Sequence, residues 1–495
     1  MKYYNLQKTN LYKNHKFSKK RKNNKNNNNN VKTYKIQKEK HGKIHGEIIS
    51  KKEGWVIVHV YGEPYQRGFA HGFLLYKEMK DVIKMFAFLL KKDYQIDLNS
   101  YLNICNKIIK PHIMNKYPEF YEEMRGIVDG FKSRGLSITI EYIIGWNSYL
   151  SMDSYLEKMN KKLSISHTDT SSSPHFLQKN ELIKNLKCSA FIATGNATEK
   201  GDIIMAHNTH SDFITGSTIN IILYITPEKG YPFVIQTSPG LIASSSDWFI
   251  CSTGLMGCET TISNISYNPE FGSPYYCRIR QAMQYGNSID EYIDIMLKDN
   301  AGDYACSWQF GDMKTNEIAL FELGLKEHSI KRTFNGVYYG MNSAIDPVLR
   351  MKETNDNEFF DLKKSSGARN SRLNQLLNNT YYGKLNIMNS KKILSDHYDT
   401  YLHRNIMNCR SVCKHLELEP EVTNRTPFFP FGCTDGKVVN SEMAKKMSFY
   451  GIFGSSCGRI FNAKEHIKKH PEYNYFKDIL KNFSKHNWIV LDNKI

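Results

Sequence analysis

The sequence contains no apolar stretch of the roughly 18 residues that a helix needs to cross a bilayer. Its most apolar short stretch, Met85–Leu90, has the length of a buried face on an ordinary helix. Residues 1–40 also lack the apolar run of about 7–15 residues that a secretory signal requires, so we expect no such signal. These absences argue against a membrane-spanning protein and leave the cellular compartment open.

Clustered cysteine motifs are also scarce, although the chain has ten cysteines. The only close pair is Cys409 and Cys413, which without a second pair or supporting histidines predicts no zinc site. A chain of 495 residues, 40% of them hydrophobic, can build a large core and needs no disulfide framework. We therefore expect mostly reduced, buried thiols, with no metal and no cofactor.

Acidic residues are rare at the start of the chain. Residues 1–53 hold 16 lysines and arginines but three acidic residues, a net charge of +13. The whole chain has a net charge of +18, so the other 442 residues carry only +5. A basic, Asn-rich segment with few apolar residues is expected to be a disordered tail. Such a tail can bind an anionic membrane surface or a nucleic acid, or have no function.

The remaining chain changes character at Cys188. Residues 54–61 alternate as a strand does, and apolar residues at three- and four-residue steps then predict helices up to about residue 155. The polar, aperiodic stretch Leu163–Pro174 predicts an exposed, cleavable linker within about 156–187. Short β-branched and aromatic runs after it predict strands, with helices at 273–300 and after about 365. This order predicts an α+β fold of two antiparallel sheets with helices on their outer faces.

Three domains are predicted from these changes: a basic tail (1–53), a mostly helical segment that ends in the linker (54–187), and a sheet-rich segment (188–495). Cys188 is the first residue of the third. If the backbone were held in a strained turn, its thiol could attack the carbonyl of Lys187, and the resulting thioester would hydrolyse. The new α-amine, with an unperturbed pKa of about 7.7–8.0, would suit a general base for its own thiol. The alternative is a buried structural cysteine.

The sequence around this residue strengthens the catalytic interpretation. KCSAFIATGNATEKGDIIMAHNTH combines Cys-Ser-Ala, a hairpin with a Thr…Gly turn, and His-Asn-Thr. From about residue 54 the chain resembles the phospholipase B-like proteins, and behind them the N-terminal-nucleophile (Ntn) hydrolases, which include penicillin acyltransferase-type enzymes and bile-salt hydrolases. The segments that carry the resemblance are Gly62–Gly72, Lys187–His210, Thr226–Ser263, Arg278–Tyr292, Cys306–Lys326, Ser395–Leu402 and Pro430–Phe449.

The resemblance implies a four-layer αββα sandwich preceded by a helical pro-segment, and self-cleavage between Lys187 and Cys188. It also implies hydrolysis of acyl bonds through a Cys188 thioester, with phospholipids as the substrate class and a phospholipase B-like activity. N-acyl amide hydrolysis and acyl transfer use the same acyl-enzyme and stay open. So does a catalytically silent scaffold that binds lipid or a partner.

Supporting residues are transferred from the resemblance one position at a time. His207 and Asn208, on the strand predicted to pair with that of Cys188, would orient its amine and thiol. Asn342 would stabilise the oxyanion through its side-chain amide. Arg372, with Arg369 as the alternative, would close the site and lower the pKa of the thiol. The adjacent Asp396 and His397 are interpreted as structural, because neighbouring residues on a helix do not face each other.

Three positions depart from the family pattern. The family commonly has tryptophan at His210, and often has an asparagine that contributes to the oxyanion hole at Cys251. Lys187 stands before the nucleophile where a small residue is usual. Family members also usually enter the secretory or lysosomal route, for which this chain shows no signal.

Overall fold

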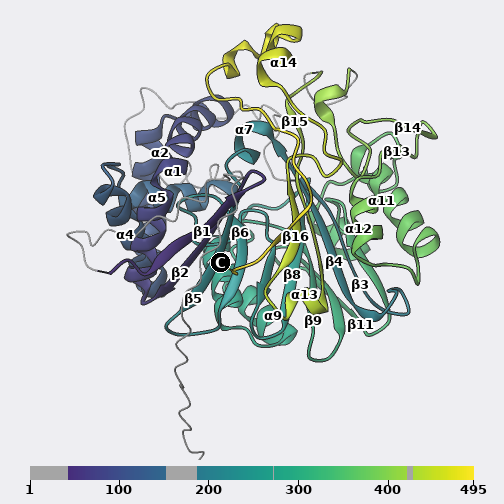
Figure 1. Cartoon of the computed structure of the whole chain (residues 1–495), viewed down its shortest axis with the longest axis horizontal. Coiled ribbons are helices and arrows are strands. Elements are labelled where there is room, and N and C mark those ends of the chain that lie inside the picture. The colour runs from purple at the N-terminus through teal and green to yellow at the C-terminus, as the bar shows by residue number, and fades with distance from the viewer. Residues whose placement is uncertain (1–42, 152–186, 271, 421–426, 495) are drawn as a thin grey trace, which may run out of the picture. The chain divides into compact units, whose positions relative to one another are not determined.

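Runs of β-branched and aromatic residues form two large sheets, as the sequence predicts. The computed structural model describes residues 43–151, 187–270, 272–420 and 427–494. The described residues from Ile44 onward form one compact unit. In the described residues, sheet A has nine strands in the order β1-β2-β5-β6-β7-β8-β9-β10-β11, and sheet B has six in the order β12-β3-β4-β15-β16-β17 (Figure 1). The predicted tail up to residue 42 and nearly all of the predicted linker lie outside the described residues.

The strands of sheet A are β1 (Gly46–Lys52), β2 (Trp55–Gly62), β5 (Ile221–Pro227), β6 (Phe233–Thr237), β7 (Phe249–Cys251), β8 (Leu255–Thr261), β9 (Cys306–Asp312), β10 (Glu317–Leu323) and β11 (His328–Thr333). Those of sheet B are β3 (Lys187–Gly195), β4 (Gly201–Asp212), β12 (Gly336–Gly340), β15 (Phe431–Asn440), β16 (Phe449–Phe453) and β17 (Ile489–Leu491). A separate two-stranded ribbon pairs β13 (Tyr398–Asp399) with β14 (Arg404–Asn405).

The segment before Cys188 contributes to sheet A as well as to the helices. β2 pairs with β5 in parallel, from Val56 opposite Ile221 to Gly62 opposite Pro227, whereas the other strand pairs of the two sheets are antiparallel. The prediction of purely antiparallel sheets is therefore wrong at this one pair. The predicted tail also ends earlier than residue 53, because residues 46–52 form β1 against β2.

Helices cover the outer face of each sheet. On one side, α1 packs against β1, β2 and α4, and α8 and α9 contact β7 and β9; on the other side, α12 packs against β4 and β15 (Figure 1). The helices of the first side are α1 (Pro64–Tyr94), α2 (Leu98–Ile104), η1 (Cys105–Ile109), α3 (Lys110–Lys116), α4 (Pro118–Ser133), α5 (Ile140–Ser148), α8 (Tyr275–Tyr285) and α9 (Ile289–Leu297). Those of the second side are α11 (Ser365–Gln375), η3 (Leu376–Thr380) and α12 (Ile387–Leu394).

The two sheets pack face to face through β3, β4 and β12 of sheet B and β8, β9 and β10 of sheet A. Along β3, Ala190 and Ile192 belong to the core shared with sheet A, whereas Phe191 and Ala193 belong to a second core with leucines of α11, η3 and α12. Gly340 of β12 lies directly against sheet A, since a Cβ there would clash with the Thr260 hydroxyl of β8. Helices, two sheets and helices thus follow one another in layers. None of the described helices has the length and apolar character that a membrane span requires.

The order of elements near the C-terminus differs from the prediction. The sequence predicts helices after about residue 365, but β15, β16 and β17 complete sheet B beside β4. The reason lies in β15, whose sequence FGCTDGKVVN places Asp435 and Lys437 at fully buried positions. Buried charged residues remove the apolar alternation by which a strand is recognised.

Candidate active site

Cys188 is the second residue of β3, and its side chain faces the space between the sheets. Its partner across the antiparallel pair is Thr209 of β4. Opposed residues of such a pair project to the same face, so the two side chains lie together. Cys188 is 1% exposed. Burial raises the pKa of its thiol well above the ordinary value, and the nearby Glu259 raises it further, whereas Lys437 lowers it.

His207 and Asn208 point to opposite faces of β4. His207 shares the face of Cys188, and its Nε2 lies 3.1 Å from the Glu259 carbonyl oxygen, to which it donates. Burial and Lys437 lower the pKa of His207 well below its usual value, so the ring is neutral. Asn208 faces the helices instead and donates from Nδ2 to the carbonyl of Leu394 at 2.7 Å. The structure therefore brings His207, but not the Asn208 side chain, to the thiol's face of the sheet.

Asn342 contacts the backbone of Cys188 directly. Its Oδ1 accepts from the Cys188 backbone N–H at 3.1 Å, and its Nδ2 donates to the Thr261 carbonyl at 3.0 Å. The sequence predicts the amide of Asn342 as an oxyanion donor, but in this arrangement the donor is engaged and the oxygen faces Cys188. A φ of 80° places Asn342 in the left-handed region, which asparagine tolerates better than most residues.

Of the two candidate arginines, Arg369 is the one beside Cys188. Its Nη1 donates to the Cys188 carbonyl at 2.5 Å and to the Ser189 hydroxyl at 3.1 Å, and its Nη2 donates to Asn342 Oδ1 at 3.0 Å. The side chain is fully buried, and burial lowers the pKa of the guanidinium to about 10, so it stays charged at neutral pH.

Arg372 lies one turn further along α11 and points elsewhere. It binds both carboxylate oxygens of Asp396, at 2.9 and 2.7 Å. The structure therefore assigns Arg372 to an ion pair rather than to the surroundings of the thiol. Asp396 in turn is held by Arg372, in agreement with the structural interpretation of that residue.

The remaining positions named from the resemblance also have defined partners. The Lys187 ammonium donates to the Ser263 hydroxyl. The Cys251 thiol donates to the Met283 carbonyl on α8 at 3.3 Å, so it turns away from sheet B. His210 lies on the Asn208 face, with Nε2 3.1 Å from the Val412 carbonyl.

A buried ion pair borders the Cys188–Thr209 pair. The Lys437 ammonium donates to Asp435, to Thr209 Oγ1 at 3.0 Å and to Gln236 Oε1 at 2.5 Å. Asp435 also accepts from Gln236 Nε2 at 2.9 Å, so both charges are fully hydrogen-bonded within the protein. The matching segment Pro430–Phe449 contains both charged residues, but a single sequence gave no reason to single them out.

Two carboxyl groups lie on the helix-covered side of sheet A, behind the Glu259 backbone that His207 contacts. Glu259 of β8 stands opposite Trp308, which packs on α9, and Asp247 precedes β7. Burial raises the pKa of Asp247 to about 6. Burial and the neighbouring Asp247 raise the pKa of Glu259 well above its usual range, and Tyr304 donates to Glu259 at 3.2 Å. Two adjacent carboxyl groups that repel each other as anions hold a proton at neutral pH.

We expect Asp247→Asn to raise the free energy of unfolding by on the order of 1–3 kcal/mol at about pH 8 and to change it little at about pH 4. Because the pKa of Asp247 is raised to about 6, the native state binds more protons than the unfolded state between the two pKa values. The stabilising contribution of the Asp247 carboxyl group is therefore fully present below its unfolded pKa of about 3.9. It is lost as the pH rises through about 6. Asparagine carries no charge and tolerates the φ of 53° at this position.

Denaturant unfolding of a Cys188→Ala chain, with and without Asp247→Asn, measures this effect on one continuous polypeptide. Asp435→Asn is the matched control, since it leaves the buried Lys437 without its anion and should lower stability at about pH 8. If Asp247→Asn lowered the free energy of unfolding at about pH 8, as Asp435→Asn is expected to do, the predicted increase would be wrong.

Comparison with known proteins agrees with the resemblance seen in the sequence. The family model of phospholipase B matches residues 57–326. An uncharacterized protein of Archaeoglobus fulgidus is 23% identical over 60% of this chain and 48% of its own length. Protein dcd1B of Dictyostelium discoideum is 24% identical over 54% of the chain and 50% of its own length. The putative phospholipase B-like 2 of Caenorhabditis elegans is 25% identical over 39% of the chain and 33% of its own length. The chain thus spans half or less of the length of these relatives.

Among solved structures, a mutant conjugated bile acid hydrolase from Clostridium perfringens matches 54% of this chain and 89% of its own, with 10% identity and a TM-score of 0.34. A similarity this low supports no residue-by-residue comparison. The family model covers more than half of the chain, including β3, β4 and β8. The chain belongs to the phospholipase B family.

Proposed function

We propose that the chain is a self-activating thiol hydrolase that cleaves acyl ester or amide bonds, with phospholipids as its substrate class. The observation that carries the proposal is the pair of contacts at Cys188. Asn342 holds its backbone nitrogen and Arg369 holds its carbonyl, which leaves the thiol on the face between the sheets. A purely structural cysteine needs neither contact.

In the first step, the Cys188 thiol attacks the carbonyl carbon of Lys187. The C–N bond breaks, the acyl group moves to sulfur as a thioester, and the nitrogen of Cys188 takes up the thiol proton as a free amine. Water then hydrolyses the thioester and leaves a carboxylate on Lys187. Asn342 Oδ1 already accepts from this nitrogen at 3.1 Å, so it would hold the new amine in place.

In the second step, the amine accepts the thiol proton while the sulfur attacks a substrate acyl carbon. The alcohol or amine leaves with a proton, and water releases the acyl group from sulfur. Asn342 and Arg369 act as positioning residues for the amine, and Arg369 adds a fixed positive charge beside the residue that becomes anionic. His207, neutral and on the same face, supports the strand through Glu259.

The uncleaved chain is expected to be inactive. Cys188 is 1% exposed, and burial keeps its thiol protonated by raising its pKa. A substrate carbonyl cannot reach a thiol that is sealed between two sheets. Scission before Cys188 both creates the base and frees the start of β3, which links activation to access.

The two products of scission should remain one particle. β2 keeps its seven-residue parallel pairing with β5, and Arg67 and Arg280 both bind the buried Glu123, at 2.6 and 2.8 Å. Removing one member of such a buried ion network leaves an unpaired charge, which is strongly unfavourable. Fragments 1–187 and 188–495 are therefore expected to separate only under denaturing conditions.

The test compares the purified chain on a denaturing gel and by size-exclusion chromatography, with mass spectrometry of the new N-terminus. We expect two bands, an N-terminus at Cys188 and a single chromatographic peak. The processed protein is then assayed on a phosphatidylcholine, a lysophospholipid and an N-acyl amide. Release of fatty acid from the phospholipids supports phospholipase B-like activity, and release from the amide alone would replace it with N-acyl amide hydrolysis.

Two results would overturn the proposal. A chain that stays intact at neutral and mildly acidic pH and hydrolyses none of the three substrates would indicate a scaffold that keeps the fold without the chemistry. A chain that turns over substrate with the Lys187–Cys188 bond intact would rule out the amine as the base.

A further inference from the structure

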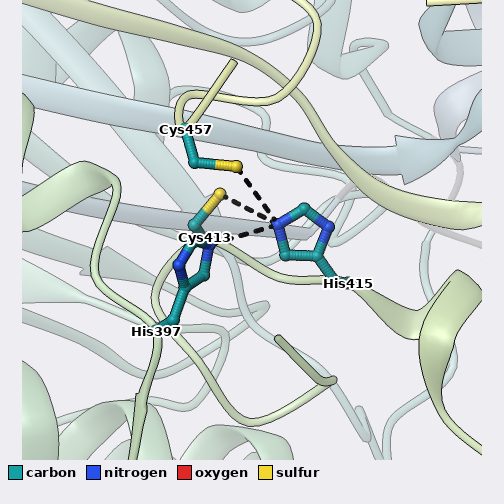
Figure 2. A group of neighbouring side chains, drawn as sticks. All are labelled: His397, Cys413, His415 and Cys457. Atoms are coloured by element: carbon teal, nitrogen blue, oxygen red, sulfur yellow. Dashed lines mark hydrogen bonds between the residues drawn. The ribbon is translucent and has the colours of Figure 1, made fainter. Parts of the chain in front are cut away.

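Two histidines and two cysteines meet at one point on the helix side of sheet B. His397 follows α12, Cys413 and His415 precede β15, and Cys457 follows β16. One nitrogen or sulfur atom from each residue lies within 4.8 Å of every other. In Figure 2, dashed lines join the Nε2 of His415 to one atom of each of the other three side chains. Cys413 and His415 are buried, and His397 and Cys457 are half-buried.

The three separations from His415 match those of a tetrahedral metal site. His415 Nε2 lies 3.3 Å from His397 Nε2, 3.4 Å from Cys413 Sγ and 3.5 Å from Cys457 Sγ (Figure 2). Ligands around zinc, with bonds of about 2.05 Å to nitrogen and about 2.3 Å to sulfur, stand about 3.3 Å apart for two nitrogens and about 3.5 Å for nitrogen and sulfur. Hydrogen bonding alone does not explain three polar partners on a ring nitrogen that can donate or accept only one.

The residues around the group suit metal ligands. His415 Nδ1 lies 2.9 Å from the buried Glu417 carboxylate, so Nδ1 carries the proton and Nε2 turns its lone pair to the centre of the group. A carboxylate behind a histidine ligand is a recurrent feature of zinc sites. The sulfur of Cys413 has the hydroxyls of Ser455 and Ser456 at 3.3 and 3.2 Å, which can donate to a thiolate.

We propose that His397, Cys413, His415 and Cys457 bind one Zn²⁺ ion. Four protein ligands leave no open coordination position, so the ion is structural and not catalytic. The sequence predicts no metal because it draws attention to Cys409 and Cys413. Of these two cysteines only Cys413 belongs to the group. His415 lies two residues after it in the same loop, and His397 and Cys457 come from two other loops.

The ion would fix the loop that contains Val412 and Cys413. This loop is hydrogen-bonded to β4, the strand that pairs with the strand of Cys188. The carbonyl of Val412, the residue before Cys413, accepts from Asn208 Nδ2 at 3.4 Å and from His210 Nε2 at 3.1 Å. Between these two residues of β4 stands Thr209, which pairs with Cys188. Asn208 and His210 thus connect the metal-binding loop to sheet B. The zinc site does not depend on whether the chain is a hydrolase.

The test measures metals in the full chain purified under reducing conditions, by inductively coupled plasma mass spectrometry. We expect about one zinc per chain, and under about 0.1 in Cys457→Ser. Cys409→Ser is the matched control, since it removes a cysteine of the same loop outside the group and should keep the metal. Removing the zinc with a chelator should lower the melting temperature by about 5 °C or more, and added Zn²⁺ should restore it.

Cobalt replacement gives a readout that does not depend on any variant folding. Co²⁺ added to the chelated protein should produce the thiolate charge-transfer band and the strong visible absorption of a tetrahedral cobalt site. Zinc below about 0.1 per chain together with no such cobalt spectrum would overturn the proposal. So would a disulfide between Cys413 and Cys457 in the protein as purified, or unchanged metal content in Cys457→Ser.

Discussion

A Cys188→Ala chain should run as a single band on a denaturing gel and hydrolyse acyl substrates at least about 10⁴-fold more slowly than the unchanged protein. Alanine has no nucleophile, so neither the shift of the Lys187 acyl group to sulfur nor formation of the substrate thioester can occur. The fold should survive, because the backbone contacts of residue 188 with Asn342 and Arg369 use its N–H and carbonyl. A loss of activity with a preserved thermal transition therefore reports on chemistry.

Cys105→Ala is the matched control for this experiment. Cys105 is also fully buried, and burial raises the pKa of its thiol to about 12, but it lies in η1 of the helical segment. It should leave both chain cleavage and turnover within a few-fold of the unchanged protein, apart from the stability cost of a small cavity. If Cys188→Ala were cleaved as usual, or if both alanine chains lost activity equally, Cys188 would not be the nucleophile.

The second large effect is expected at Arg369. Arg369→Ala removes the donors to the Cys188 carbonyl and to Asn342 Oδ1, and should lower turnover by about 10²–10³-fold, the loss typical of one preorganised charged donor. Chain cleavage should slow in parallel, since both reactions use the same residue. Arg369→Lys keeps the charge but not the two-pronged contact, so we expect an intermediate rate.

Arg372→Ala, three residues further along α11, separates this effect from a general loss of charge. It breaks a partly exposed pair with Asp396, which should cost little stability and change turnover less than about five-fold. Turnover, cleavage rate and melting temperature are measured on all three variants. Arg372→Ala falling as far as Arg369→Ala, at equal folded fractions, would contradict the placement of the charge beside Cys188.

The choice between these two arginines shows what a single sequence can predict here. Arg369 and Arg372 lie three residues apart on one predicted helix, so their side chains point in similar directions. Which of the two reaches Cys188 depends on how α11 is rotated about its axis against sheet B. That rotation is set by the leucines of the second core, including Leu373 and Leu376. Sequence periodicity identifies the helix, but the rotation depends on a sheet whose partner strands lie far away in the chain.

The strands of residues 187–323 were predictable because their β-branched and aromatic residues alternate or run continuously. β15 was missed for the opposite reason, since it carries the buried Asp435 and Lys437. Register was out of reach as well: Thr209, not Asn208, stands opposite Cys188, and a shift of one residue would exchange their faces. The group of His397, Cys413, His415 and Cys457 was missed because three separate loops, and not a local spacing, bring its members together.

The pairing of β2 with β5 has a consequence for the lifetime of the processed protein that we propose. These strands lie on opposite sides of the bond proposed to break, so the continuous chain forms the pair by closing a loop, at a modest entropic penalty. Once the bond is gone, the same pairing requires two separate polypeptides to find each other again. Unfolding of the processed protein by heat or denaturant would then be irreversible. Its working lifetime would be governed by its rate of unfolding rather than by its equilibrium stability.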